Sequence, residues 1–168
     1  MDEELQLSWG TVPPVIVDLA RLLSRRASEN ARRVERMTWP DRPGDVQEEL
    51  RLAIGAAHKT TKAATDVRAL LSAYAHKFHN PRPVISDLAR AQETSSQGFI
   101  RRYSEGTVDA VASLLSPKPN VNLLLAAFPS VSIIDLVDLG GAVGEAAREL
   151  LDSEGYEANT RRTRGTVE

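Results

Sequence analysis

The sequence has 168 residues, which corresponds to one domain or to one domain with appended helices. Hydrophobic residues make up 42% and charged residues 26%, a composition that excludes disorder along the whole chain. Because aromatic residues contribute only 5%, the core must be built from aliphatic side chains and alanine. The lack of cysteine excludes a disulfide framework, a thiolate zinc site and a cysteine nucleophile.

Two features of the sequence indicate where in the cell the protein is located. Residues 1–6 are acidic and lack the basic and apolar regions of a secretory signal. The most apolar stretch, residues 121–143, is interrupted by Pro129, Asp135 and Asp138, so it is not expected to cross a bilayer. The sequence therefore predicts a cytoplasmic protein with no membrane partner.

Residues 1–44 are expected to form a basic helix followed by a proline-rich linker. After Pro13 and Pro14, apolar residues recur every three or four positions, which predicts one helical face: Ile16, Leu19, Leu23, Ala27, Val34 and Met37. Six arginines lie on the other face, against Glu29 and Glu35: Arg21, Arg25, Arg26, Arg32, Arg33 and Arg36. This face is either simply solvated or a surface for nucleic acid or an acidic partner. Two prolines and a glycine within residues 39–45 end the helix.

Residues 45–80 are expected to form one long helix from about Asp45, its N-cap, to His76. Apolar and small residues recur with the heptad period of a coiled coil: Val46, Leu50, Ala53, Ala57, Thr60, Ala64, Val67, Leu71, Tyr74 and Phe78. Small Ala53, Ala57 and Ala64 would let a partner helix approach closely. That partner is either the first helix folded back or the same helix of a second chain, and the sequence leaves both open.

Prolines at 81 and 83 end the long helix, because the residue before a proline avoids the α region. Shorter helices are expected over residues 84–93, 96–103, 105–115, 121–128, 132–139 and 142–152. The remaining domains are thus expected to be a trihelical unit over 81–116, an acidic helical pair over 117–155 and a disordered basic tail over 156–168. Within the helical pair, Ser132 and Asp135 are expected to form a capping box. The fold class predicted is all-α.

Two short helices in the trihelical unit have the pattern of a pair that crosses at a steep angle. Ala89 in the first helix is small enough for the second helix to cross there, and Phe99 would anchor the second helix from inside. Ser95 or Ser96 would cap the second helix by accepting a hydrogen bond from a free backbone N–H. This segment resembles the DNA-binding helix-turn-helix superfamily.

The second helix carries most of the resemblance. Residues 96–106 are similar to the recognition helix and following turn of Cro-like phage repressors, with Ile100 and Tyr103 at apolar anchor positions. The Ser-Gln-Gly start at 96–98 is also similar to the recognition helix of tetracycline-repressor-type regulators. The turn holds Glu93 and Thr94 where a glycine and an aliphatic residue are usual.

The resemblance implies binding to double-stranded DNA, with the second helix in the major groove. Base contacts are expected from Ser96, Gln97, Gly98, Arg101 and Arg102, and phosphate contacts from Lys77, Arg82 and Arg90. Between residues 76 and 103 the sequence has five basic and two acidic residues, so this segment is basic although the whole chain has a net charge of −2. The expected function is that of a non-enzymatic transcriptional regulator that binds pseudo-palindromic DNA as a homodimer. No cofactor is expected, and the sequence assigns no effector.

The alternative is a helical adaptor or oligomerisation module that binds another protein through the alanine-rich seam and the apolar helix around residues 123–125. Two further patterns are interpreted as structural. Residues 137–145 resemble the first motif of S-adenosylmethionine-dependent methyltransferases, but Ala142 stands where such loops usually have glycine, so a glycine helix break is predicted. His58, His76 and His79 lack a residue that would complete a metal site, so helix-terminal histidines are predicted.

Overall fold

The structure, a computed structural model, describes the backbone of residues 10–164 and the side chains of residues 10–154. All regular elements in this part are α-helices, as the sequence predicts. They are α2 (Pro14–Glu35), α3 (Pro43–Lys77), α4 (Ile85–Ala91), α5 (Ser96–Ile100), α6 (Glu105–Leu114), α7 (Val121–Ala127), α8 (Ile133–Leu139) and α9 (Gly141–Arg164). Among the described residues, no helix combines the length and apolar character needed to cross a membrane.

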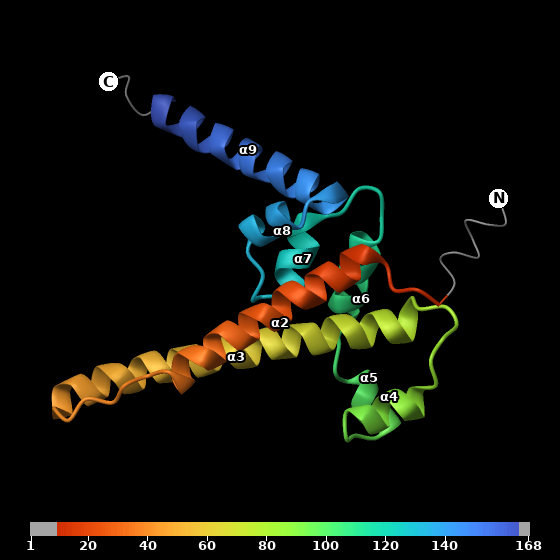
Figure 1. Cartoon of the computed structure of the whole chain (residues 1–168). Coiled ribbons are helices and arrows are strands. Elements are labelled where there is room, and N and C mark those ends of the chain that lie inside the picture. The colour runs from red at the N-terminus through yellow and green to blue at the C-terminus, as the bar shows by residue number, and fades with distance from the viewer. Residues whose placement is uncertain (1–9, 165–168) are drawn as a thin grey trace.

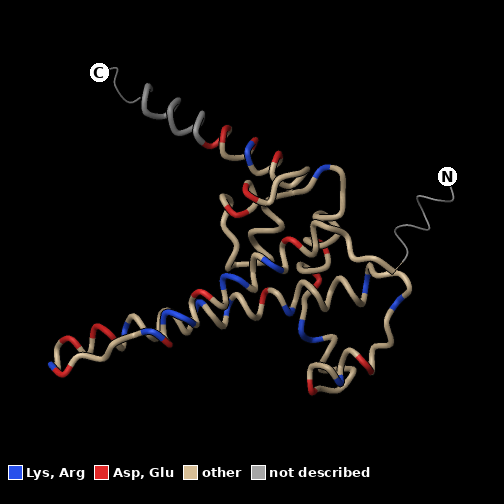
Figure 2. The backbone as a smooth tube through the Cα atoms, viewed as in Figure 1, with Lys and Arg blue, Asp and Glu red and all other residues tan. Residues whose placement is uncertain are grey.

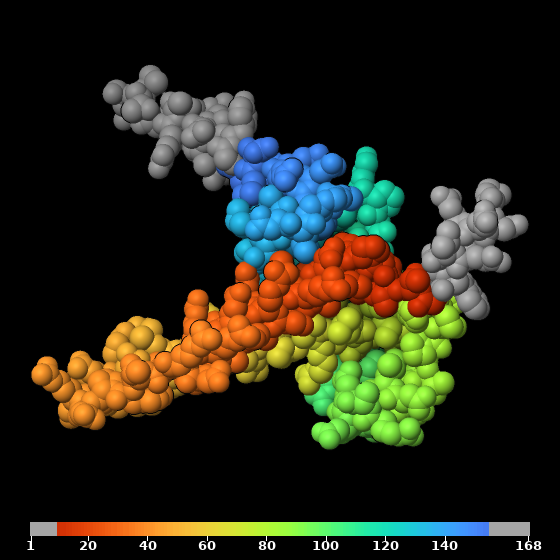
Figure 3. Space-filling model, viewed as in Figure 1, coloured from red at the N-terminus to blue at the C-terminus, as the bar shows by residue number. Residues whose placement is uncertain are grey.

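The antiparallel hairpin of α2 and α3 organises the molecule (Figure 1). Helices α7 to α9 lie on one side of the hairpin and the short helices α4 and α5 on the other, whereas α6 crosses the hairpin in this view and packs on α3 and α7 (Figure 1). The far end of the hairpin extends beyond both groups, as the space-filling view shows (Figure 3). At this end α2 and α3 are packed only against each other.

Helix α2 confirms the predicted apolar face. Ile16, Leu19 and Leu23 are completely buried. Proline at the first helical position costs no intrahelical hydrogen bond, which suits the start at Pro14. Asn30 is also buried, and its side-chain amide donates to the carbonyl of Arg26 at 2.8 Å.

Helix α3 begins two residues before the predicted start. Arg42 is the N-cap and Pro43 the first helical residue, so the capping role predicted for Asp45 is wrong; Asp45 lies in the first turn. Proline is favoured there because its fixed φ suits the helix and the N–H it lacks would be unbonded anyway. An acidic side chain in the first turn still interacts favourably with the helix dipole.

The coiled-coil pattern of α3 pairs within the chain, with α2. Ala53 lies on the seam as predicted. The prediction that Ala57 and Ala64 also lie on the seam is wrong, because both are exposed. The buried seam instead continues one residue earlier, through Ala56, Ala63 and Leu70, while Leu71 remains 44% exposed. Neighbouring apolar positions at 56 and 57, 63 and 64, and 70 and 71 give α3 two adjacent apolar faces, and α2 covers only one.

The main core lies where the base of the hairpin meets helices α6 to α9. It is aliphatic as predicted, with two large aromatic members, and its buried residues are Ile16, Leu19, Leu23, Leu70, Ala73, Tyr74, Ala110, Val111, Leu114, Val121, Leu124, Phe128, Val131, Leu136, Val143 and Ala147. Burial of such side chains contributes about 1.5–3 kcal/mol each for the larger ones. This core holds the base of the hairpin rigid.

The predicted trihelical unit over 81–116 is divided differently in the structure. Helix α6 packs on α3 and α7, and it contributes Ala110, Val111 and Leu114 to the main core. Helices α4 and α5 pack on each other. The short pair is therefore held by the end of α3, whereas α6 belongs to the body of the protein.

In the C-terminal part, the predicted helix break and capping box are confirmed, but the predicted end of the last helix is not. Gly140 and Gly141 have φ angles of 70° and 60°, which favour glycine, so the predicted glycine break between α8 and α9 is confirmed. The capping box of Ser132 and Asp135 is confirmed as well. Helix α9 continues to Arg164, although the sequence predicted disorder from residue 156. Extension of a formed helix gains one hydrogen bond per residue, and no proline interrupts it; residues 165–168 lie outside the described part.

Candidate nucleic-acid interface

Helices α4 and α5 cross through the two residues that the sequence singled out. Ala89 is 2% exposed and Phe99 is 1% exposed, so the predicted inward positions are confirmed. The hydroxyl of Ser95 accepts a hydrogen bond from the backbone N–H of Gly98 at 3.0 Å and caps α5. A small residue facing a large one lets two short helices approach closely at a steep angle.

The turn between the two helices adopts the conformation for which glycine is usual. Glu93 has a φ of 53°, in the left-handed region, and its N–H donates to the carbonyl of Arg90 at 3.0 Å. The N–H of Thr94 donates to the carbonyl of Ala89 at 3.0 Å. A helix commonly ends with such a left-handed residue. The backbone therefore forms the turn although its sequence lacks the usual glycine.

Gly98 is required by a close approach between the turn and α5. A Cβ atom at this position would overlap the Oγ1 atom of Thr94 and lie 3.3 Å from both the Cβ of Thr94 and the Oγ of Ser95. Thr94 is half-buried, and rotation of its side chain would leave its Cβ at the same short distance. Gly98 thus serves the packing of the turn and, having no side chain, can meet DNA only through its backbone.

The pair is fastened to the last turns of α3 by polar and aromatic contacts. The side-chain N–H of Gln92 donates to the hydroxyl of Ser72 at 2.7 Å. The Nδ1 atom of His76 is hydrogen-bonded to the hydroxyl of Tyr103. The rings of His76 and Phe99 meet edge to face at 6.0 Å, and those of Phe99 and Tyr103 at 6.2 Å. These contacts fix the orientation of α5 relative to the hairpin.

Burial shifts the proton affinity of both members of the hydrogen-bonded pair. The pKa of His76 is lowered below 6.5, first by burial and then by the positive charges of Lys77 and Arg82. Burial raises the pKa of Tyr103 above 10.0. Both groups are therefore favoured in their neutral forms, in which one donates a hydrogen bond to the other.

The predicted base-contacting residues are divided between α5 and the turn that follows it. Ser96 and Gln97 lie exposed in the first turn of α5. The helix ends at Ile100, three residues earlier than predicted, so Arg101 and Arg102 lie after its last turn. The chain leaves the helix there because Tyr103 bonds to α3 and Ser104 caps α6. Arg101 is exposed and Arg102 half-buried.

The predicted phosphate-contacting residues come from three different segments. Lys77 ends α3, Arg82 lies in the linker after it and Arg90 lies in α4, and all three are exposed. Arg90 approaches the carboxylate of Asp87 at 3.4 Å, an exposed pair that contributes little to stability. Basic positions occur on both chain segments that connect the α4–α5 pair to the body (Figure 2).

A groove of about 340 Å³ separates the α4–α5 pair from α3. Its walls are mainly apolar, and they comprise Val12, Leu71, Ser72, Tyr74, Ala75, His79, Leu88, Ala91, Gln92 and Phe99. The side-chain carbonyl oxygen of Gln92 is buried without a hydrogen-bond partner among the described residues. The pair is thus attached along one edge and separated from α3 along the other.

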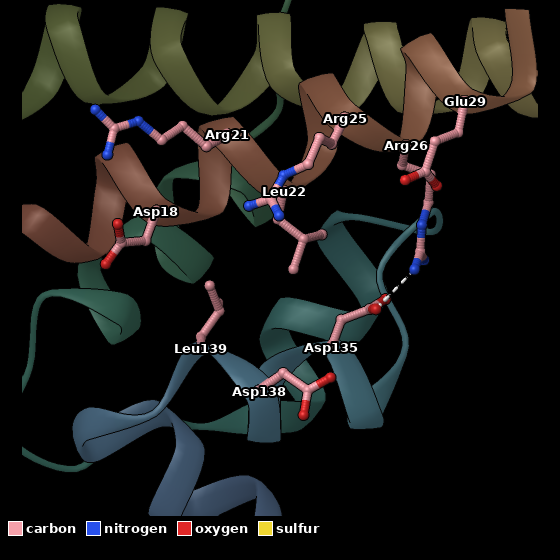
Figure 4. A pocket seen from close by; sticks show the side chains of 9 residues that line it. All are labelled: Asp18, Arg21, Leu22, Arg25, Arg26, Glu29, Asp135, Asp138 and Leu139. Atoms are coloured by element: carbon pink, nitrogen blue, oxygen red, sulfur yellow. Dashed lines mark hydrogen bonds and ion pairs between the residues drawn. The ribbon is translucent and has the colours of Figure 1, made fainter. Parts of the chain in front are cut away.

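A second recess, of about 510 Å³, lies between α2 and α8 and is lined mostly by charged residues (Figure 4). Arg26 donates to both carboxylate oxygens of Asp135 at 2.6 Å and to the carbonyl of Ser130 at 2.7 Å. Buried Asp66 accepts from the N–H of Ser130 at 2.9 Å. Burial raises the pKa of Asp135, but hydrogen bonds from Ser132 and Arg26 outweigh it and hold the pKa below 3.8. These groups satisfy one another and hold the loop before α8 on the hairpin.

Comparisons with protein families, characterised proteins and solved structures found no match. The site has to be interpreted from its own geometry. Among the described residues, the α4–α5 pair is the part that combines a rigid turn, exposed polar side chains at a helix start and basic residues on its flanks.

The contacts that hold the pair in place were not predicted from the sequence. His76 was expected to be a helix-terminal histidine, and Ser72 and Gln92 had no predicted role. The available signal was compositional: in a chain with only three phenylalanines and three tyrosines, Phe99 and Tyr103 lie four residues apart. A cluster of aromatic residues in such a chain indicates an anchoring point, and His76 is its third ring.

Proposed function

We propose that the protein binds double-stranded DNA through the α4–α5 pair and acts as a transcriptional regulator. The observation that carries the proposal is the turn itself, in which Ala89 and Phe99 fix the crossing and Glu93 takes the left-handed conformation. A helix presented in this way can enter the major groove with its N-terminal residues toward the base edges.

The exposed side chains supply the two kinds of contact that DNA recognition needs. Ser96 and Gln97 at the start of α5 can hydrogen-bond to base edges, and Arg101 extends beyond its end. Lys77 and Arg82, on the segment leading into α4, are placed to contact phosphates. Each phosphate contact releases counterions, so binding is expected to weaken steeply with salt.

A double substitution tests the proposal. Arg101→Ala with Arg102→Ala is expected to weaken duplex binding by about 1–3 kcal/mol for each arginine that contacts a base. The matched control replaces Arg32 on α2 and Arg36, the C-cap of α2, by alanine; both are exposed. Fluorescence anisotropy with a duplex selected from a random pool measures the dissociation constants.

The two double variants separate specific from general electrostatic binding. A large loss in the variant at Arg101 and Arg102 with a small change in the variant at Arg32 and Arg36 supports the proposal. An unchanged titration for the variant at Arg101 and Arg102 would refute it. Equal losses in both would show attraction by overall charge, which also contradicts a role for the α4–α5 pair.

The adaptor alternative keeps only part of the surface that it needs. Helix α2 covers Ala53 of the alanine-rich seam, Ala57 and Ala64 remain exposed, and Leu124 is completely buried in the main core. Leu123 alone of residues 123–125 is largely open, at 38% exposed. A protein partner that copurifies in the absence of nucleic acid, together with no retention on duplex DNA, would favour the adaptor.

A further inference from the structure

Helix α3 has an apolar face that α2 does not cover. Leu50 is 46% exposed, Ile54 is 68% exposed and Leu71 is 44% exposed. Ala57 and Ala64, between them, are exposed as well. We call the exposed residues Leu50, Ile54, Ala57, Ala64 and Leu71 the open stripe of α3. Most helix stability in proteins comes from packing of such a face, and here the far end of the hairpin has no other helix against it (Figure 1).

Four of the five residues of the open stripe have the same order in both directions; Ile54 has no exposed counterpart, because the matching position holds half-buried Val67. Leu50, Ala57, Ala64 and Leu71 follow one another at intervals of seven residues, with leucine at both ends and alanine in the middle. In an antiparallel pair of α3 helices with a two-fold axis between residues 60 and 61, Leu50 of one copy lies opposite Leu71 of the other. In the same way, Ala57 of one copy lies opposite Ala64 of the other. Small residues near the axis allow close approach of the backbones, and a two-fold interface requires such self-complementarity.

Helix α2 extends the surface at the end where a partner would place its Leu50. An apolar recess of about 760 Å³ lies beside Leu71. The other residues around it are Val12, Val17, Ala20, Arg21, Ser24, Arg25 and Ser28. Small side chains on α2 thus leave room for a large apolar side chain at the level of Leu71, where the antiparallel arrangement brings one.

The charges of the hairpin favour the antiparallel direction. The tip, residues 39–51, carries four acidic residues, Asp41, Asp45, Glu48 and Glu49, against Arg42 and Arg51, so its net charge is −2; Arg51 is already paired with Glu48 at 2.6 Å. The opposite end of the same face carries Arg21 and Arg25 beside the recess, and Arg68 on α3. An antiparallel pair brings each acidic tip to the partner's arginines, whereas a parallel pair would bring the two acidic tips together.

From these observations we infer that a second copy of this chain docks antiparallel on the open stripe, so that two hairpins form a four-helix bundle. This dimer follows from the hairpin alone and does not depend on DNA binding. One consequence does rest on the proposed function. The α4–α5 pair is fastened at Ser72 and His76, so the two pairs of a dimer would be separated by about 40 Å along the bundle, at 1.5 Å per residue. This is close to one turn of DNA, the usual spacing of half-sites.

Crosslinking of the full chain tests the docking and its direction, because the sequence has no native cysteine to interfere. A short bis-maleimide is expected to join two copies of Thr61→Cys, next to the axis. It should also join copies of the double variant Leu50→Cys with Leu71→Cys, and leave each of these single variants unlinked. Efficient linking of the single variants, with none for Thr61→Cys, would overturn the antiparallel arrangement.

Light scattering, which measures the mass of the protein in solution, provides a second test of the dimer. The unmodified chain is expected to have twice the mass of 18.4 kDa at micromolar concentration. Ala64→Glu should raise the dimer dissociation constant at least tenfold, while Ala112→Glu, at an exposed position on α6, should leave it unchanged. A monomeric mass for the unmodified chain, or equal effects of both substitutions, would overturn the proposal. A monomer that binds DNA would refute the dimer alone, and a dimer that does not bind DNA would refute the proposed function alone.

Discussion

The hydroxyl of Tyr103 is hydrogen-bonded to Nδ1 of His76, which fastens the segment after α5 to the last turn of α3. The same turn of α3 carries the aromatic contact to Phe99, and Ser72 one turn earlier holds Gln92. Helix α3 therefore connects two proposed activities, with the docking stripe along its outer face and the α4–α5 pair at its C-terminal end. Its rigidity would set the distance between two DNA-binding units.

The contact between His76 and Tyr103 makes the attachment of the α4–α5 pair sensitive to acid. Because the pKa of His76 is lowered in the folded protein, the unfolded chain binds the proton more readily. The stabilising contribution is complete above pH 6.5 and is lost as the pH falls through the lowered pKa of the folded state. Protonation would also place a third positive charge beside Lys77 and Arg82.

Urea unfolding between pH 7.5 and 5.5 measures this effect. The unmodified chain is expected to lose more stability on acidification than His76→Gln, which has no titrating ring at this position. An NMR titration of the His76 ring should give a midpoint below 6.5. A midpoint at or above this value, or identical pH profiles for the two proteins, would contradict the interpretation.

Glu93 is expected to limit the stability of the turn. A residue with a Cβ costs about 1–2 kcal/mol in the left-handed region, and the flexibility of glycine in the unfolded chain offsets part of that cost. Glu93→Gly should therefore stabilise the protein by about 1 kcal/mol in urea unfolding. Glu93→Ala removes the same charge and keeps the Cβ, so it should give no such gain. Equal effects of the two substitutions would show that charge, and not backbone conformation, determines the result.

The elements that could be predicted are those with local signals. Prolines at 14 and 43 and glycines at 140 and 141 begin or end helices within two residues of the predicted places. The register of α3 could not be predicted, because adjacent small residues such as Ala56 and Ala57 make two faces equally suitable for a partner. Only the position of α2 decides between them.

The extent of α5 and the grouping of the short helices depend on contacts between residues far apart in the sequence. The pattern from Ser96 to Tyr103 is helical throughout, but the bond from Tyr103 to His76 draws the chain away after Ile100. Similarly, the apolar residues of α6 suit either the α4–α5 pair or the main core, and the core offers the larger apolar surface. Composition and periodicity contain no information about these choices.

Replacement of Gly98 by alanine tests whether packing or helix propensity dominates at this position, because the two have opposite effects on the free energy of unfolding. In an open helical position, replacing glycine by alanine stabilises by up to about 1 kcal/mol. Gly55 in α3 is such a position, since a Cβ there would meet no atom within 4 Å, and Gly55→Ala is expected to stabilise the protein. At Gly98 the new Cβ would overlap Oγ1 of Thr94, so Gly98→Ala should destabilise by about 1–3 kcal/mol in urea unfolding. Combining it with Thr94→Ala should recover most of the loss, because the overlapping Oγ1 is removed, but not all of it, because the Cβ of residue 94 remains at 3.3 Å. Stabilisation by Gly98→Ala comparable to that of Gly55→Ala would show that the turn and α5 do not approach each other as closely as this structure has them.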